Sequence, residues 1–82
     1  MKEKEELIKN KNKIHTTKLG AERIERNLKI QSKNLIAYCI NKIMKKNSEV
    51  YKKGKNYYVE IDNIRFTINS NTFTIITAHK IK

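Results

Sequence analysis

Histidine, arginine and lysine are the side chains of this 82-residue chain whose types could do chemistry. His15 precedes the first apolar helical stripe, and His79 lies near the end of the chain. A histidine titrates close to neutral pH and can move the proton of a ribose 2′-hydroxyl. An arginine such as Arg23 or Arg65 can stabilise the negative charge that develops on a phosphate under attack. Metal-independent cleavage of RNA to a 2′,3′-cyclic phosphate needs no other kind of group.

A second set of side chains is of the kind that holds nucleic acid without reacting. Lysines and arginines neutralise phosphates, and a tyrosine outside the core can stack on an unpaired base. We expect Tyr57 to pack in the core and Tyr58 to be the stacking residue. The nucleic-acid-binding candidates are Arg26, Lys52, Lys53, Lys55, Tyr58, Thr77 and Lys80.

Each candidate also has an ordinary structural interpretation. His15 can cap a helix or lie on the surface, and His79 can be a plain strand residue. Arg23 and Arg26 can balance the glutamates beside them. The Lys-Lys-Gly-Lys run can be a solvated turn. The sequence alone leaves both interpretations open.

The charge balance bears on the partner. The chain has 19 Lys and Arg against 8 Asp and Glu, which gives a net charge of +11 and a pI near 9.9. Such an excess is typical of nucleic-acid-binding domains. The same lysine-, asparagine- and isoleucine-rich composition can instead reflect an AT-rich genome. We expect RNA ahead of DNA as the partner.

Other chemistries lack their residues. No second Cys or His stands at metal-ligand spacing, and Gly20 and Gly54, the only glycines, form no phosphate-binding loop. We therefore expect no metal and no cofactor. Cys39 falls on an apolar helical stripe and is expected to be a core thiol, and a lone cysteine favours the cytoplasm. No apolar run reaches the roughly 18 residues of a membrane span, and no signal peptide is recognisable.

Two helices are predicted before the strands. Thr16-Thr17 is a plausible N-cap for a stripe of Ala21, Ile24 and Leu28. Ser32 is a second cap candidate, and the stripe after it predicts a core helix of about 13 residues. That stripe contains Leu35, Ile36, Cys39, Ile40 and Ile43. Residues 1–13 form a charged arm or a short helix, and residues 14–82 form one domain.

From Glu49 onwards the apolar period changes from 3.6 to 2, which predicts strands. Asp62-Asn63 is expected to be a two-residue hairpin turn. The strands are expected at Glu49–Lys53, Asn56–Ile61, Ile64–Asn69 and Thr72–Ala78. We therefore expect an α+β fold, with two or three N-terminal helices on one face of a four-stranded antiparallel meander. The other face, which carries Arg65, is expected to be polar and open.

Three segments, HTTKLGAERIERNL, KKGKNYYVEID and FTIITAHK, together resemble a family of small bacterial and phage proteins of unknown function. This resemblance extends from Ile14 to Lys80. A looser resemblance lies in a histidine before an arginine-bearing helix, a second helix, and a meander that ends in Thr-Ala. It is to the barnase, colicin and RelE-like ribonuclease superfold.

The looser resemblance implies a site. Toxins of that group cleave RNA without a metal and use His, Arg, Lys and Tyr on the open sheet face. It implies an acid or base at His15 and closure of the site by Thr77 and His79. Arg23, Lys55 and Arg65 would contact the phosphate or the transition state. The chain departs from the pattern because no glutamate is clearly placed as the general base, with Glu60 facing either phosphate or solvent.

Two functions follow as hypotheses. The first is a small RNA-directed protein, a toxin-like metal-independent endoribonuclease with catalytic candidates His15, Arg23, Arg65 and His79. The alternative is a non-catalytic module that binds nucleic acid or a nucleoprotein, such as a phage or mobile-element regulator or inhibitor. A structural or protein-binding role, with compositional charge, is a third. The expected partners are nucleic acid and a protein partner or antagonist, with no membrane.

Overall fold

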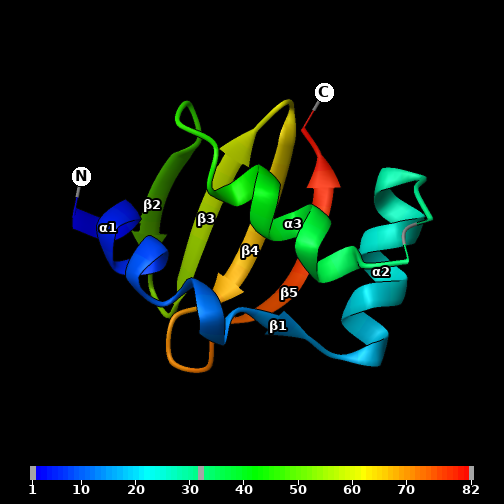
Figure 1. The fold of residues 1–82 in the computed structure, drawn as a ribbon, viewed down its shortest axis with the longest axis horizontal. Coiled ribbons are helices and arrows are strands. Elements are labelled where there is room, and N and C mark those ends of the chain that lie inside the picture. Colours follow the sequence, from blue (N-terminus) through cyan, green and yellow to red (C-terminus); the bar gives the residue numbers. More distant parts are fainter. Residues whose placement is uncertain (1, 32, 82) are drawn as a thin grey trace.

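The structure is a computed structural model that describes residues 2–31 and 33–81. These residues form three α-helices, a short 3-10 helix and five strands. Helices α1 and α3 lie on one face of the sheet, and α2 lies beside β5 (Figure 1). The helices are α1 (Lys2–Lys9), η1 (Lys11–Lys13), α2 (Lys18–Leu28) and α3 (Leu35–Ile43). The strands are β1 (His15–Thr16), β2 (Glu49–Lys53), β3 (Asn56–Ile61), β4 (Ile64–Asn69) and β5 (Thr74–Lys80).

The sheet has five strands in the order β1-β5-β4-β3-β2, and one pair of strands is parallel. β2 to β5 form the antiparallel meander that the sequence predicts. The prediction of four antiparallel strands was wrong at the other edge, where His15 and Thr16 pair in parallel with Thr74 and Ile75. A strand of two residues is too short to show a periodic signal in the sequence, so β1 is specified by its contacts with β5.

Helix α2 begins as the sequence predicts. The Thr17 hydroxyl accepts a hydrogen bond from the Gly20 amide at 3.0 Å, and Ile24 and Leu28 are buried. Gly20 packs closely against the β1–β5 pair. A Cβ at this position would clash with the Thr16 hydroxyl and lie 3.1 Å from the carbonyl oxygen of Ile75. The helix can approach β5 this closely because residue 20 has no side chain.

Helix α3 has the predicted buried stripe but is shorter than predicted, at nine residues. Ser32, the proposed cap, lies outside the described residues. The cap in the structure is Asn34, whose side chain accepts a hydrogen bond from the Ala37 amide at 3.1 Å. At the other end, the buried Ser48 hydroxyl donates to the carbonyl of Ile43 at 2.8 Å, which ends the helix before the lysines.

The N-terminal segment is a helix rather than a free arm. Its Leu7 is fully buried, and Lys4 joins it to the loop between α3 and β2. The Lys4 ammonium donates to the carbonyls of Lys45, Lys46 and Ser48 at 3.1, 2.9 and 2.9 Å. Helix α1 is therefore part of the core that supports β2.

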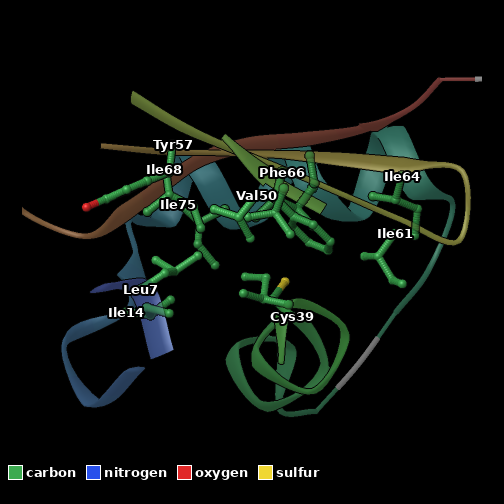
Figure 2. Packing of buried hydrophobic residues seen from close by; sticks show 14 of the residues in the cluster. Leu7, Ile14, Cys39, Val50, Tyr57, Ile61, Ile64, Phe66, Ile68 and Ile75 are labelled. Carbon is green, nitrogen blue, oxygen red and sulfur yellow. The ribbon is translucent and has the colours of Figure 1, made fainter. Parts of the chain in front are cut away.

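The core lies between the sheet and the helices α1 and α3. Figure 2 shows Leu7 and Cys39 facing the sheet side chains Val50 and Phe66. Burial raises the pKa of the Cys39 thiol to about 11. The prediction that Cys39 is a core residue is confirmed.

Alternation along the strands divides the sheet into two faces. Positions such as Val59 and Phe66 point into the core, and the positions between them are half-buried or exposed. We call this second surface the open face. Its residues are Glu49, Tyr51, Lys53, Asn56, Tyr58, Glu60, Arg65, Thr67, Asn69, Thr77 and His79. It is the polar face that the sequence predicts opposite the core helix.

Candidate nucleic-acid interface

Glu60, Arg65 and His79 occupy one row of the open face. Arg65 on β4 is paired in register with Glu60 on β3 and with His79 on β5. The guanidinium of Arg65 binds the Glu60 carboxylate through Nε and Nη2, each 3.0 Å from Oε2. Two of the predicted catalytic residues, Arg65 and His79, thus stand side by side, with a carboxylate on the far side of the arginine.

The Glu60 carboxylate is held on one side only. The Tyr51 hydroxyl donates a hydrogen bond to Oε2 at 2.9 Å, and the same oxygen accepts a hydrogen bond from Arg65. These two hydrogen bonds, with Tyr51 the larger contributor, lower the pKa of Glu60, and the same carboxylate raises the pKa of Tyr51. Among the described residues no hydrogen bond reaches Oε1. Because its pKa is lowered, Glu60 is ionised at neutral pH. Its second oxygen, Oε1, is available to a ligand.

The next row along the strands is aromatic at one end and small at the other. Tyr51, Tyr58, Thr67 and Thr77 stand opposite one another on β2, β3, β4 and β5. The rings of Tyr51 and Tyr58 stack with centroids 5.5 Å apart and planes 23° apart. Tyr57, by contrast, is buried in the core. Tyr58 is thus the tyrosine whose position suits a bound base.

Helix α2 borders the open face along β5. Asn27 donates to the Ala78 carbonyl at 3.2 Å and lies 3.4 Å from the hydroxyl of Thr77, which is on the open face. Arg23 lies one helical turn before Asn27 and so shares its side of the helix, and Arg26 is the neighbour of Arg23 three residues on. Both arginines are exposed. In the part of the chain that the structure describes, neither forms an ion pair with a glutamate.

His15 does not join the other catalytic candidates. It is exposed on β1, with Nδ1 2.8 Å from the carbonyl of Lys13 and Nε2 3.1 Å from the hydroxyl of Thr74. A carbonyl can only accept, so Nδ1 carries a proton. Thr74 and His79 are five residues apart on β5, a separation of about 16 Å at the usual rise of a strand. One phosphate cannot contact both histidines.

The predicted lysines divide between the two faces. Lys53 is on the open face opposite Asn56, and Lys55 is in the adjoining turn. Lys52 instead shares the core face with Tyr57, and its ammonium lies 5.8 Å from the centre of that ring. Lys80 pairs with Ile64 and so also falls on the core-facing side. Of these four lysines, only Lys53 and Lys55 can contact a ligand that lies across the open face.

Charged side chains of both signs meet at the end of the sheet near the Asp62–Asn63 turn. A shallow hollow of about 300 Å³ lies there, and its lining includes the carboxylates of Glu49, Glu60 and Asp62. Lys42 and Lys45 bind the Asp62 carboxylate at 2.7 and 2.9 Å, and these hydrogen bonds lower the pKa of Asp62. Lys42 and Lys45 neutralise Asp62, and Arg65 neutralises Glu60, so among the described residues Glu49 is the carboxylate of this hollow without an ion pair.

Sequence reasoning missed Tyr51 and Asn27, and it left the direction of Glu60 open. Tyr51 carried a usable signal, because alternation and strand pairing place it on the same face as Tyr58. Asn27 carried none, since its contact with Thr77 joins residues 50 positions apart.

Neither a metal centre nor a membrane helix is present in residues 2–31 and 33–81. No group of three or more His, Cys, Asp or Glu side chains there could hold a metal ion. No helix there is long and apolar enough to cross a membrane.

A family model described as a protein of unknown function (DUF3781) matches residues 8–79. The chain therefore belongs to this family, as the three sequence segments indicate. No curated protein and no solved structure matches the chain. The looser resemblance to the ribonuclease superfold is thus not confirmed.

Proposed function

We propose that the protein binds RNA across the open face of its sheet. One observation carries this proposal. The open face joins a tyrosine ring, an arginine and a histidine on adjacent strands, and an exposed arginine of α2 borders it. These residues are Tyr58, Arg65, His79 and Arg23. Cations that bind phosphates, next to an aromatic ring that can stack on a base, are what RNA recognition by a sheet requires.

The net charge of the chain suits an anionic ligand. Each phosphate that a lysine or arginine neutralises releases counterions, so affinity falls as the salt concentration rises. For a single strand, each phosphate contact steepens the slope of log affinity against log salt concentration by about 0.7. The chain has a net charge of +11. Within the proposal the protein acts in the cytoplasm, where a lone reduced cysteine is ordinary.

Two neighbouring lysines provide a matched test. Lys53→Gln removes a cation from the open face, and Lys52→Gln removes one from the other face of the same strand. Both variants have the same net charge. We expect Lys53→Gln to lower affinity for a labelled RNA oligonucleotide and to reduce the salt slope by about 0.7, while Lys52→Gln leaves both nearly unchanged. Equal losses in the two variants would show that binding does not use the open face.

RNA cleavage is a second candidate, favoured by the row of Glu60, Arg65 and His79. In this scheme the free Oε1 of Glu60 takes the proton of the 2′-hydroxyl, whose oxygen attacks the phosphorus. The 5′-oxygen leaves and takes a proton from the imidazolium of His79. Arg65 stabilises the charge on the phosphate oxygens. The products are a 2′,3′-cyclic phosphate and a 5′-hydroxyl.

Labelled RNA incubated with the protein in EDTA tests both candidates in one experiment. Cleavage predicts a cyclic phosphate end, with loss of cleavage in Glu60→Gln and His79→Ala and retention in His15→Ala. Glu60→Gln also removes a carboxylate that competes with phosphate for Arg65, so it should bind RNA more tightly while no longer cutting it. Retardation of uncut RNA by the native protein would contradict the catalytic candidate and leave a binding module. Preference for DNA under the same conditions would contradict the choice of RNA.

A further inference from the structure

The size of the side chains changes abruptly across one row of the open face. Tyr51 and Tyr58 on β2 and β3 are followed by Thr67 and Thr77 on β4 and β5. We call this row the tyrosine step. Adjacent strands lie about 4.8 Å apart, so two strand widths of short side chains separate Tyr58 from helix α2 beside β5.

The tyrosine step leaves one face of one ring uncovered by another aromatic ring. Tyr51 covers one face of Tyr58, with a centroid distance of 5.5 Å and nearly parallel planes. Tyr58 stands between Tyr51 on β2 and Thr67 on β4, so the side of Tyr58 away from Tyr51 has a short side chain beside it. Tyr51 is itself oriented by its hydrogen bond to Glu60 at 2.9 Å, which limits the freedom of the pair.

Polar groups surround the low part of the step, which is the end formed by Thr67 and Thr77. Asn27 of α2 reaches the Thr77 hydroxyl at 3.4 Å, and Arg23 lies one turn earlier on the same side of the helix. Arg65 lies in the adjacent row and is paired with His79. The low part therefore has an aromatic wall at one end, hydroxyls in its floor, and amide and guanidinium groups at the other end.

We propose that the tyrosine step binds one unpaired nucleobase of single-stranded RNA, stacked on the free face of Tyr58 above Thr67. This inference rests on the proposed RNA binding and specifies its substrate class. The base stacks on Tyr58, its polar edge meets Thr77 and Asn27, and Arg23 binds a neighbouring phosphate. A paired duplex does not fit this arrangement, because its bases are already stacked on one another.

The test separates base stacking from phosphate binding by using two ligands of equal length. One is octauridylate, which is unstructured, and the other is an abasic oligomer with the same backbone. Stacking on a tyrosine corresponds to about 5- to 150-fold in affinity per base. We expect the native protein to bind octauridylate tighter than the abasic oligomer by a factor in this range.

Two substitutions at one position provide the control. Thr67→Phe fills the low part of the step beside Tyr58, whereas Thr67→Val keeps its size and removes only a hydroxyl. We expect Thr67→Phe to reduce the preference for octauridylate to about onefold, with unchanged affinity for the abasic oligomer. Thr67→Val should keep most of the preference. Thermal unfolding of both variants verifies that they fold, and Tyr58→Leu gives a second route to the same loss.

The failures are distinguishable. Equal binding of the two oligomers by the native protein, or an unchanged preference in folded Thr67→Phe, would overturn the tyrosine step while leaving RNA binding intact. Failure of the native protein to bind either oligomer would overturn the proposed function and this inference together.

Discussion

The substitution Gly20→Ala tests how α2 is held beside the open face. An alanine in a helix is normally more stable than a glycine by about 1 kcal/mol, so the substitution would stabilise an ordinary helix. In this protein the added methyl would clash with the Thr16 hydroxyl and lie 3.1 Å from the Ile75 carbonyl oxygen. We therefore expect the opposite sign.

The magnitude follows from what the methyl displaces. The Thr16 hydroxyl donates to the Ile75 carbonyl at 2.7 Å, and losing this hydrogen bond costs about 1 kcal/mol. Forcing a methyl into a close-packed contact costs about 1–3 kcal/mol. After subtraction of the helix-propensity gain, Gly20→Ala should destabilise the protein by about 1–3 kcal/mol. For a domain of this size that lowers Tm by about 5–20 °C.

The assay is thermal and urea unfolding of a double-mutant cycle with Thr16→Ala. Removing the Thr16 hydroxyl first removes the worst contact, so Gly20→Ala should cost much less in that background, with a coupling of about 1–2 kcal/mol. An increase in Tm for Gly20→Ala alone would refute the close approach of α2 to β5. Equal effects in the two backgrounds would refute the role of Thr16.

Three further predictions concern the rest of the molecule. Because the pKa of Cys39 is raised from 9.0 to about 11, its thiolate fraction at pH 8 is about 100-fold lower than that of a free thiol. A thiol reagent should modify it rapidly only in urea, and fast modification of the folded protein would contradict its burial. Lys4→Met should lower stability by about 1–2 kcal/mol in urea unfolding through the loss of its bonds to three carbonyls, whereas exposed Lys2→Met should not. The pKa values of Glu60 and Asp62 are lowered in the folded protein, so the unfolded chain binds more protons as pH falls. The stability from these groups is complete above their ordinary values of 4.5 and 3.8 and is lost as pH falls through the lower folded values. Urea unfolding between pH 7 and pH 3 should show this loss, smaller in Glu60→Gln, and equal stability at pH 5 and pH 3 would contradict it.

Elements with a long periodic signal were predictable. Strand β3 has strict alternation from Asn56 to Ile61, and its buried and half-buried positions follow the pattern. Asp62 and Asn63 both have positive φ, as a two-residue hairpin turn requires. In each case the determining interactions are local, so they are visible in a short window of sequence.

Contacts between distant residues were not predictable. Strand β1 is stabilised by pairing with residues 59 positions later, and nothing in the two residues His15 and Thr16 indicates this partner. The position of His15 depends on the same pairing, which is why it was grouped with His79. Helix α3 ended early because the Ser48 side chain bonds the Ile43 carbonyl, a contact outside the apolar stripe.

Successive side chains along a strand point to opposite faces of the sheet, and this alternation decides which basic residues lie on the same face. Lys52 and Lys53 have the same charge and adjacent positions, yet only Lys53 lies on the face that carries Tyr58. The open face places Arg65 between Glu60 and His79, and on α2 Arg23 lies one helical turn before Asn27, which contacts Thr77. The polar groups of this face are thus arranged in a specific way, and that arrangement, more than the net charge, is the physical argument for a nucleic-acid ligand.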